Sequence, residues 1–399
     1  MESIRGYWDP EVESPATVGI LGGGPIAIEA ALYARFLGYY VELFEADRVA
    51  GLPSSLEDQR MPIILREATS SLGRAALEAQ GSTLGELSLD DACTYRQWVE
   101  HYLLPLARTD LIYDSVHAHS KVHSVSRLRT GGNVCVVPQE RANDQFRLMV
   151  ESQNRGEWSA LVDVLLDCSG WTGAERGLGP GGGFAIGERS VRDRVQRTLP
   201  RSSQIRRGQH YLLWGSGGLA FEFLKRLASS FTDVRVTWFV EETAADSENV
   251  LEIRRIAEMQ LQHFAFVPCL GIESIQSLDA DRFQVSVALP DETSVDVQGD
   301  HLLSLPEPTR ELSFLQRLST TWTPLRHASV LDEESDGWEG WRLTTEEPHY
   351  YLMGSKYWGR AEEIGTLAEM HLQIRDLFAL LGKRRNLDLY DDFAKREVR

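Results

Sequence analysis

Two glycine-rich segments of the chain carry residues at a spacing that could hold a phosphate. Both have the pattern Gly-x-Gly-x-x-Ala, at Gly22, Gly24, Pro25 and Ala27 in the first segment and at Gly215, Gly217 and Ala220 in the second. In this pattern the first glycine permits a tight turn, the second lets the backbone approach a pyrophosphate, and the small third residue lets a helix lie close to a strand. A pyrophosphate would sit at the positive N-terminus of that helix. The sequence therefore predicts two dinucleotide sites.

Acidic residues follow both glycine segments at the distance expected of a ribose-binding carboxylate, which is about 20 residues. Glu45 lies 45 − 22 = 23 residues after Gly22. In the second half, Glu241 and Glu242 close the corresponding strand, and no arginine occupies that strand end. A carboxylate accepts hydrogen bonds from a 2′-hydroxyl and repels a 2′-phosphate, so the second site favours NADH over NADPH. Arg254 and Arg255 come later in the sequence and would weaken this preference only if their helix folded back.

The elements around both glycine segments follow the order strand, turn, helix, strand. The first set is predicted at residues 17–21, 25–37 and 40–44, and the second at 211–214, 219–231 and 234–240. Further strands are predicted at 115–126, 133–137, 146–151, 160–167, 283–288, 294–297 and 350–354, and helices at 95–106 and 363–381. The pattern indicates an α/β protein built on βαβ units.

Composition and charge exclude several classes of function. The 399 residues carry a formal net charge of −18, so no excess of Lys and Arg is available to neutralise phosphates of nucleic acid. No apolar run approaches the roughly 20 residues that span a bilayer, and the N-terminus lacks the pattern of a signal peptide. We therefore expect a cytoplasmic protein that binds neither nucleic acid nor membranes.

The cysteines and histidines encode no local metal or redox motif. The four cysteines are Cys93, Cys135, Cys168 and Cys269, and the nearest pair is 168 − 135 = 33 residues apart. No Cys-x-x-Cys occurs and the histidines form no cluster with metal-ligand spacing. We expect scattered reduced thiols and no metal site.

The two glycine segments resemble those of the two-dinucleotide-binding-domain flavoproteins, the group of thioredoxin reductases and flavin-containing monooxygenases. In that group the first segment binds FAD and the second binds NAD(P)H. The apolar stretch 162–171, which ends in Cys168-Ser169-Gly170-Trp171, resembles the group's strand ending in Ala-Thr-Gly. This resemblance implies that Ser169 and Gly170 contact FAD where the chain crosses between domains.

Two C-terminal segments, 347–360 and 373–378, resemble the final FAD-contacting part of a bacterial branch of the group. The resemblance implies contacts from Gly354 and Ser355. Together with the glycine segments, it implies two Rossmann-like three-layer domains, the second inserted into the first. Residues 1–200 and 326–399 would form the FAD-binding domain, and residues 201–325 the NAD(P)H-binding domain.

The chain also departs from the group's patterns. The redox cysteine pair of thioredoxin reductases is absent from the sequence. The monooxygenase signature Phe-x-Gly-x-x-x-His is also absent: the corresponding stretch, residues 181–188, has the sequence GGGFAIGE. Ser355 stands where many members have the aspartate that binds the ribityl chain. Where the group has a second strand ending in Ala-Thr-Gly, this chain has the sequence HLLSLP at residues 301–306. The nicotinamide-binding half is therefore the more divergent one.

Lys356, Arg360 and Trp171 are the candidate catalytic residues, because they adjoin segments expected near the isoalloxazine ring. Lys356 or Arg360 could stabilise an anionic reduced flavin or hold a carboxylate substrate. The alternative is that both contact FAD or surface carboxylates and that Trp171 only packs.

The favoured function is an FAD-dependent oxidoreductase in which NAD(P)H, and NADH in preference, reduces the flavin. Without redox cysteines, monooxygenation of a small organic substrate is its most natural reaction. Two alternatives stay open: a substrate-reduced FAD dehydrogenase or oxidase with a vestigial nicotinamide domain, and a flavin-binding protein without turnover. A homodimer is an oligomeric state that the Trp-containing C-terminal region allows.

Overall fold

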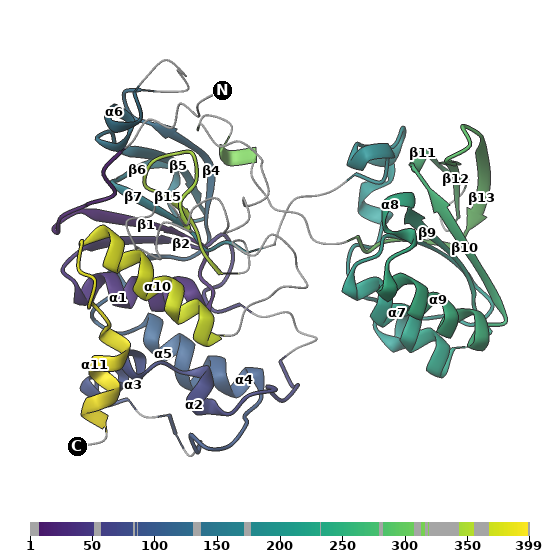
Figure 1. The fold of residues 1–399 in the computed structure, drawn as a ribbon. Coiled ribbons are helices and arrows are strands. Elements are labelled where there is room, and N and C mark those ends of the chain that lie inside the picture. Colours follow the sequence, from purple (N-terminus) through teal and green to yellow (C-terminus); the bar gives the residue numbers. More distant parts are fainter. Residues whose placement is uncertain are drawn as a thin grey trace. The chain divides into compact units, whose positions relative to one another are not determined.

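In the computed structural model of the protein, the chain divides into two compact units (Figure 1). Unit 1 comprises residues 1–172 and 310–399, and unit 2 comprises residues 173–309, so unit 2 is inserted into unit 1 along the sequence. The described residues are 8–51, 57–82, 84–85, 87–130, 137–170, 177–231, 233–278, 282–306, 313–315, 318, 343–354 and 367–397. The assignment of domains to cofactors, with boundaries after residues 200 and 325, stays a prediction.

The centre of unit 1 is a parallel sheet of five strands in the order β15-β7-β1-β2-β3. The strands are β1 (Thr17–Leu21), β2 (Tyr40–Phe44), β3 (Val116–His117), β7 (Val164–Asp167) and β15 (Tyr350–Leu352). The central strands β1 and β7 are covered on both faces, which explains their continuous apolar sequence. The carboxyl ends of parallel strands meet at one edge, so Gly22, Glu45 and Cys168 are brought together there.

One face of this sheet is covered by helices, of which α1 packs on the strands β1 and β2 and α10 packs on α1 (Figure 1). Besides α6, which is described with the antiparallel sheet, the α-helices in the described part of unit 1 are α1 (Pro25–Phe36), α2 (Leu65–Ala68), α3 (Ser71–Ala79), α4 (Tyr95–Trp98), α5 (Leu104–Ala107), α10 (Leu367–Leu381) and α11 (Leu389–Glu397). Helix α1 begins with a proline, whose fixed φ and missing N–H suit the first helical position. Its residues are buried almost all round because it lies between the sheet and other helices.

The opposite face of the sheet is covered by an antiparallel sheet, with the strand order β4-β5-β6. These strands are β4 (Ser120–Arg127), β5 (Phe146–Ser152) and β6 (Gly156–Val162), and α6 (Pro138–Ala142) precedes β5. Alternate residues of β5, namely Phe146, Leu148 and Val150, are buried in the core between the sheets. Unit 1 therefore has three layers: helices, parallel sheet and antiparallel sheet.

A buried ion pair fixes the C-terminal part of unit 1 to the antiparallel sheet. Glu347 is fully buried and its two carboxylate oxygens accept hydrogen bonds from Arg127 Nε at 2.7 Å and Arg141 Nη2 at 2.5 Å. Arg127 also stacks on the ring of Phe146 at 3.7 Å. Because the single Glu347 carboxylate is held by two buried guanidinium groups, the chain enters β15 from one defined position.

Unit 2 repeats the three layers. Its parallel sheet has the order β10-β9-β8-β14, with β8 (His210–Trp214), β9 (Arg235–Glu241), β10 (His263–Cys269) and β14 (His301–Ser304). Helices α7 (Gly218–Ser230), α8 (Glu242–Ala245) and α9 (Glu248–Gln260) belong to the same unit, and α7 and α9 pack on one face. The antiparallel strands β11 (Gly271–Ser277), β12 (Phe283–Ala288) and β13 (Ser294–Gly299) cover the other. The predicted α/β class with two Rossmann-like three-layer domains, the second inserted into the first, is confirmed.

Several elements differ from those predicted. The run 160–167 is not one strand: it divides at Asp163 between β6 and β7, because the Asp163 carboxylate accepts hydrogen bonds from Thr17 N–H at 2.7 Å and Gln145 Nε2 at 2.9 Å. The helix at 95–106 contains a π-helical turn at Val99–Leu103. Residues 133–136 and 363–366 of two predicted elements lie outside the described residues.

Candidate functional site

The first glycine turn lies at the carboxyl edge of the unit 1 sheet, between β1 and α1. Gly22 has a φ of +97°, which favours glycine, and its N–H donates to Phe44 O at 2.8 Å. A Cβ placed on Gly22 would lie 2.8 Å from Cys168 O, so no larger residue fits. At Gly24, by contrast, an added Cβ would meet nothing within 4 Å. The turn is closely packed beneath its first glycine and open above its second.

The N-terminus of α1 faces this open space. Gly24 is the N-cap and no side chain caps the helix, so its N-terminal partial positive charge is left for another group. Pro25 occupies the first helical position, and Ala27 is fully buried where the helix meets the sheet. These are the three roles that the spacing predicts.

Glu45 follows the last residue of β2 and reaches back to the turn. One carboxylate oxygen accepts Gly23 N–H at 2.6 Å and the other accepts Asp47 N–H at 2.8 Å. A carboxylate has about four lone-pair positions, so two remain for further donors. The half-buried Glu45 therefore holds the turn and keeps capacity for two hydroxyl groups of a ligand.

Ser169 and Gly170 follow β7 beside the same edge. The Ser169 hydroxyl donates to Asp167 Oδ1 at 2.7 Å, and Asp167 is fully buried and also accepts the Tyr350 hydroxyl at 2.6 Å. Gly170 has a φ of +66°, a backbone conformation that favours glycine. Trp171, the next residue, lies outside the described residues.

Gly354 brings the C-terminal segment to the first turn of α1. It has a φ of +63°, and a Cβ on it would lie 3.2 Å from Ile26 Cγ2. Its N–H donates to Gln373 Oε1 of α10 at 2.8 Å, and Gln373 is itself buried. Ser355, Lys356 and Arg360 lie outside the described residues, so their predicted contacts stay predictions.

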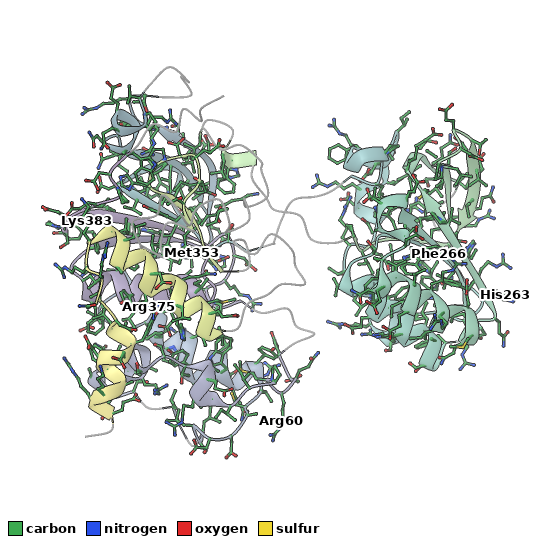
Figure 2. The ribbon with its side chains drawn as sticks, viewed as in Figure 1. Arg60, His263, Phe266, Met353, Arg375 and Lys383 are labelled. Atoms are coloured by element: carbon green, nitrogen blue, oxygen red, sulfur yellow. The ribbon has the colours of Figure 1, made fainter. Side chains whose placement is uncertain are left out.

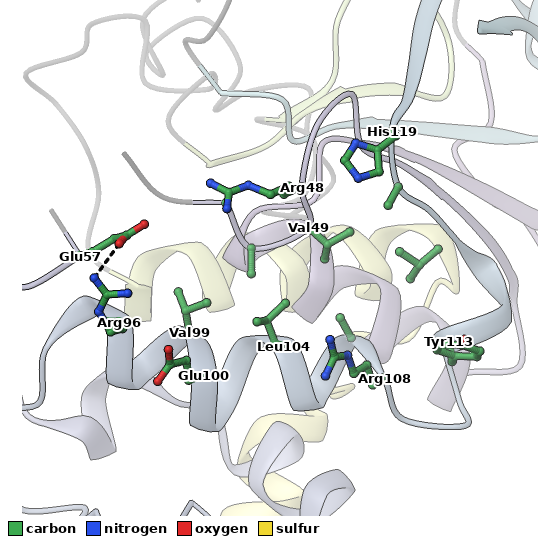
Figure 3. A pocket seen from close by; sticks show the side chains of 15 residues that line it. Arg48, Val49, Glu57, Arg96, Val99, Glu100, Leu104, Arg108, Tyr113 and His119 are labelled. Carbon is green, nitrogen blue, oxygen red and sulfur yellow. Dashed lines mark hydrogen bonds and ion pairs between the residues drawn. The ribbon is translucent and has the colours of Figure 1, made fainter. Parts of the chain in front are cut away.

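A pocket of about 650 Å³ opens beyond β2, next to the segment that follows Glu45 (Figure 3). Its wall contains three arginines and a histidine, and apolar residues of α4 to α5 form another side. The polar residues are Arg48, Arg96, Arg108, His119, Glu57, Glu100 and Tyr113, and the apolar ones include Val49, Val99 and Leu104. Arg96 is paired with Glu57 at 2.8 Å, as Figure 3 shows. The volume is that of a typical small-ligand site.

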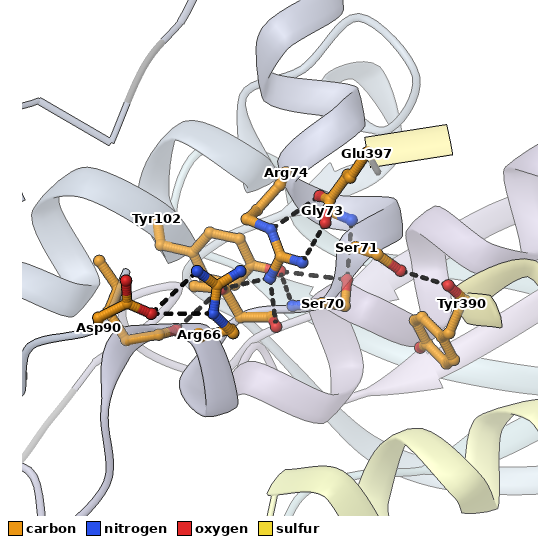
Figure 4. A network of polar contacts seen from close by, with 11 residues as sticks. Arg66, Ser70, Ser71, Gly73, Arg74, Asp90, Tyr102, Tyr390 and Glu397 are labelled. Atoms are coloured by element: carbon orange, nitrogen blue, oxygen red, sulfur yellow. Dashed lines mark hydrogen bonds and ion pairs between the residues drawn. The ribbon is translucent and has the colours of Figure 1, made fainter. Parts of the chain in front are cut away.

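A buried cluster of polar side chains among the helices of unit 1, centred on Glu29, was not predicted from the sequence. Glu29 of α1 is 2% exposed and accepts the Ser70 hydroxyl at 2.9 Å and the Tyr102 hydroxyl. Burial, and then the Glu29 charge, raise the pKa of Tyr102 well above its usual value. Figure 4 shows Ser70 and Tyr102 together with the contact of Ser71 to Tyr390. The cluster therefore ties α1, α3 and α11 together.

The second glycine turn lies between β8 and α7 of unit 2. Gly215 has a φ of +109°, and a Cβ on it would lie 2.5 Å from Pro306 Cα. Gly217 is the N-cap of α7 without a side-chain cap, and its N–H donates to Leu305 O at 3.3 Å. Ala220 is fully buried. The turn geometry of unit 1 thus recurs, with the 305–306 segment close to it.

Glu241 is the last residue of β9, and α8 begins immediately after it with Glu242. Both acids therefore stand at the carboxyl end of the strand, as predicted. Arg254 lies on α9, where it pairs with Glu258 at 2.7 Å and stacks on Phe266 at 4.6 Å; Phe266 is labelled in Figure 2. This arginine is thus engaged within α9 and against β10.

Three cysteines are described, Cys93, Cys168 and Cys269, and all are buried thiols. Burial raises the pKa of Cys269 to about 12, so its thiol stays protonated at neutral pH. Among the described residues, no group of three or more His, Cys, Asp and Glu side chains could hold a metal ion. Nor does any helix within the described ranges have the length and apolar character needed to cross a membrane.

Comparisons with known proteins agree at the level of the fold. No protein-family model matches the chain. No curated protein matches it by sequence. Among solved structures, the bacillithiol disulfide reductase Bdr (YpdA) from Bacillus cereus is similar with a TM-score of 0.54 and 13% identity, over 96% of this chain and 99% of that chain.

The FAD-bound structure of DfoA, the cadaverine monooxygenase of desferrioxamine biosynthesis in Erwinia amylovora, is similar with a TM-score of 0.56. It is 11% identical, over 94% of this chain and 98% of that chain. Bdr from Staphylococcus aureus has a TM-score of 0.53 and 13% identity, over 93% and 99% of the two chains. The chain therefore has the fold of the two-dinucleotide-binding-domain FAD/NAD(P) oxidoreductases, which confirms the predicted resemblance.

Proposed function

We propose that this protein is an FAD-dependent oxidoreductase whose flavin is reduced by NAD(P)H, and that it oxygenates a small organic substrate. The observation that carries the proposal is the repetition of one geometry. In each unit a glycine turn stands at the carboxyl edge of a parallel sheet, before a helix whose N-terminus has no side-chain cap. Ligands of open α/β sheets bind at this edge.

The residues of unit 1 fit FAD. The open space at Gly24 would admit the pyrophosphate to the N-terminus of α1. The free lone pairs of Glu45 would accept the ribose hydroxyls, and the pocket beyond β2 has room for the adenosine end. Ser169, Gly170, Gly354 and Ser355 would line the path toward the flavin ring. That DfoA has the same fold and holds FAD supports this assignment.

Bound FAD would supply the hydride and oxygen chemistry, and the protein would bind it, orient it and adjust its charge. Lys356 and Arg360 would place positive charge near the flavin ring or hold a carboxylate of the substrate. Trp171 would lie against the ring where the chain leaves β7. The role in catalysis of these three residues is a proposal based on their neighbours in sequence.

Unit 2 would bind the nicotinamide dinucleotide through Gly215, Gly217 and Ala220, with Glu241 on the ribose. NADH is favoured because Glu241 and Glu242 would repel a 2′-phosphate, and because Arg254 is already engaged by Glu258 and Phe266. Monooxygenation is favoured over disulfide reduction because no two cysteines are close in sequence and the three described thiols are buried.

One observation favours a second candidate function. The Gly217 N–H, which would face a pyrophosphate, donates to Leu305 O at 3.3 Å, and Pro306 lies against Gly215. If this segment keeps a nucleotide out, the protein is a dehydrogenase or oxidase that its substrate reduces. A flavin-binding protein without turnover is the remaining alternative.

An anaerobic titration of the purified protein with NADH, followed in the visible flavin spectrum, separates these functions. Rapid bleaching of the flavin bands is the expected result and would exclude the substrate-reduced alternative. A flavin spectrum that neither NADH nor NADPH changes would overturn the assignment of unit 2. A protein that binds no flavin when refolded or incubated with FAD would overturn the proposal as a whole.

A further inference from the structure

Two arginines in the wall of the pocket beyond β2 have no partner within the described residues. Arg48 lies in the loop after β2 and Arg108 directly follows α5, and both are exposed. In the described ranges, neither guanidinium group takes part in an ion pair or a side-chain hydrogen bond. Two planar cations therefore face a cavity of about 650 Å³.

The carboxylates of the pocket wall are directed to a different arginine. Arg96 pairs with Glu57 at 2.8 Å and with Asp58 at 3.1 Å. The hydrogen bond and charge of Asp58, and then the charges of Glu57 and Glu100, raise the pKa of Arg96. The acids of this wall therefore accompany Arg96 and leave the first two arginines available to a ligand.

The surface between these two arginines is apolar. Figure 3 shows Arg48 and Arg108 on opposite sides of Val49 and Leu104. Tyr113, which is 62% exposed, adds an aromatic ring to the wall. A phosphate on such a surface would lose hydration, whereas a flat uncharged ring gains from the contact. The pocket therefore suits an aromatic heterocycle.

The pocket also adjoins the first glycine turn. Ala50 lines it, and the Ala50 N–H donates to Gly23 O at 2.8 Å. Glu45 accepts Gly23 N–H at 2.6 Å in the same turn. A dinucleotide with its pyrophosphate at Gly24 and its ribose at Glu45 would thus have its base in this pocket.

Guanidinium groups already stack on rings elsewhere in this chain. Arg127 lies 3.7 Å from the centre of the Phe146 ring, and Arg155 lies 4.3 Å from that of Trp158. The guanidinium is planar and covers an aromatic face, while a lysine ammonium is a compact charge without a flat face. An arginine is therefore the residue to expect beside a bound base.

We propose that Arg48 and Arg108 clamp the adenine ring of FAD by stacking of their guanidinium planes, and that this contact sets how tightly the adenosine end is held. The proposal rests on the assignment of FAD to unit 1. The two residues act on the uncharged base, since the N-terminus of α1 is available to the pyrophosphate.

Titration of the flavin-free protein with FAD, followed by flavin fluorescence, tests the clamp. Arg48→Lys and Arg108→Lys keep the charge but remove the flat group, so each should weaken FAD binding about fivefold. FMN lacks the adenosine and should bind both variants as it binds the unchanged protein. FAD affinities equal to that of the unchanged protein, or an equal loss for FMN, would overturn the proposal.

Competition between FAD and two nucleoside diphosphates locates the effect at the base. ADP and UDP carry the same ribose and pyrophosphate, so ADP should compete about fivefold more strongly because its purine has the larger face. Both lysine variants should reduce this preference, and equal competition by ADP and UDP in the unchanged protein would contradict the clamp.

The control is Arg66→Lys, because Arg66 pairs with Asp90 at 2.9 Å and does not line the pocket. Its FAD affinity should equal that of the unchanged protein, and a fivefold loss in this variant too would contradict the clamp. An unchanged protein that binds no FAD would refute the proposed function itself. A protein that binds FAD equally well with and without the two guanidinium groups would refute only the clamp.

Discussion

The two glycine turns have the same backbone geometry but are held from different sides. In unit 1 the Glu45 carboxylate at the end of β2 accepts Gly23 N–H, and Gly23 O accepts Ala50 N–H, so polar groups above the sheet hold the turn. In unit 2 the indole of the fully buried Trp238 donates to Gly215 O at 2.8 Å from within β9. A glycine turn of this geometry can thus be fixed from outside or from inside the core.

The two sheets are also completed differently. Unit 2 builds its four parallel strands from one continuous stretch of chain. Unit 1 takes its edge strand β15 from far along the sequence and holds it through Glu347. The site of unit 1 therefore depends on a distant segment that carries Gly354, whereas the turn of unit 2 depends on the adjacent 305–306 segment.

The largest expected effect is the loss of stability on substitution of Gly22, the first glycine of the unit 1 turn, compared with substitution of Gly24, the second. Gly22→Ala should destabilise the protein by about 3 kcal/mol or more, because it combines a positive φ with a clash at Cys168. Gly24→Ala should change stability by no more than about 1 kcal/mol yet weaken FAD binding on the order of 100-fold. Urea unfolding and flavin titration measure the two effects.

The corresponding change in unit 2, Gly215→Ala, sharpens this comparison. It should remove reduction by NADH while the flavin stays bound, since the clash with Pro306 lies in the other unit. If G24A binds FAD as tightly as the unchanged protein, then the open space at Gly24 is not the pyrophosphate site.

The next effect concerns the buried ion pair that holds the C-terminal segment in unit 1. Glu347→Gln should cost about 3–5 kcal/mol of stability, because it leaves Arg127 and Arg141 buried without a balancing charge. The matched control is Glu222→Gln, whose partner Arg226 lies at the surface of unit 2, with an expected change below about 1 kcal/mol. Equal unfolding midpoints for the two variants would contradict this view of unit 1.

The coenzyme preference of unit 2 should respond to its strand-end acids. Exchange of both Glu241 and Glu242 for arginine should raise the NADPH-to-NADH ratio of kcat/KM about tenfold, since two carboxylates are replaced by phosphate-binding groups. Glu292→Arg, in the β12–β13 turn, is the charge control. An unchanged ratio in the double variant would refute the role of these acids.

The effect that is smallest within one pH unit is on the pH dependence of stability. His349 has a pKa of about 3 in the folded protein and about 6.5 when unfolded, so the unfolded chain binds the extra proton as the pH falls. Its contribution is therefore present above pH 6.5 and declines by about 1.4 kcal/mol per pH unit toward pH 3. Unfolding of H349N should lack this part of the slope; identical slopes for the two proteins would show that His349 is not buried as a neutral ring.

Local features of the fold and the site could be predicted from the sequence. The turn at Gly22 and the position of Glu45 follow from spacing within one βαβ unit, because a strand and a helix of ordinary length bring them together. The break at Asp163 was missed, since its partner Thr17 lies 163 − 17 = 146 residues away. Glu29 gave a usable signal: it is the only acid in the otherwise apolar stretch of α1.

Pairs that are distant in sequence left no such signal. Arg127 and Glu347 are 220 residues apart, and each alone resembles a surface charge. The pocket beside Glu45 combines three segments whose meeting depends on how the helices cover the sheet. Spacing therefore predicts the glycine turns and their acids, while tertiary contacts determine the pockets that surround them.

The distant origin of β15 also sets an order of events during synthesis. Tyr350 pairs with Leu165, which is 350 − 165 = 185 residues earlier, and all of unit 2 is translated between them. Closing so long a loop is entropically costly and slow, whereas unit 2 can fold as soon as its own continuous chain has emerged. Until β15 arrives, β7 is an open apolar edge of the sheet. The nascent chain is thus most exposed to aggregation, and most in need of a chaperone, between the folding of the inserted unit and the arrival of residue 350.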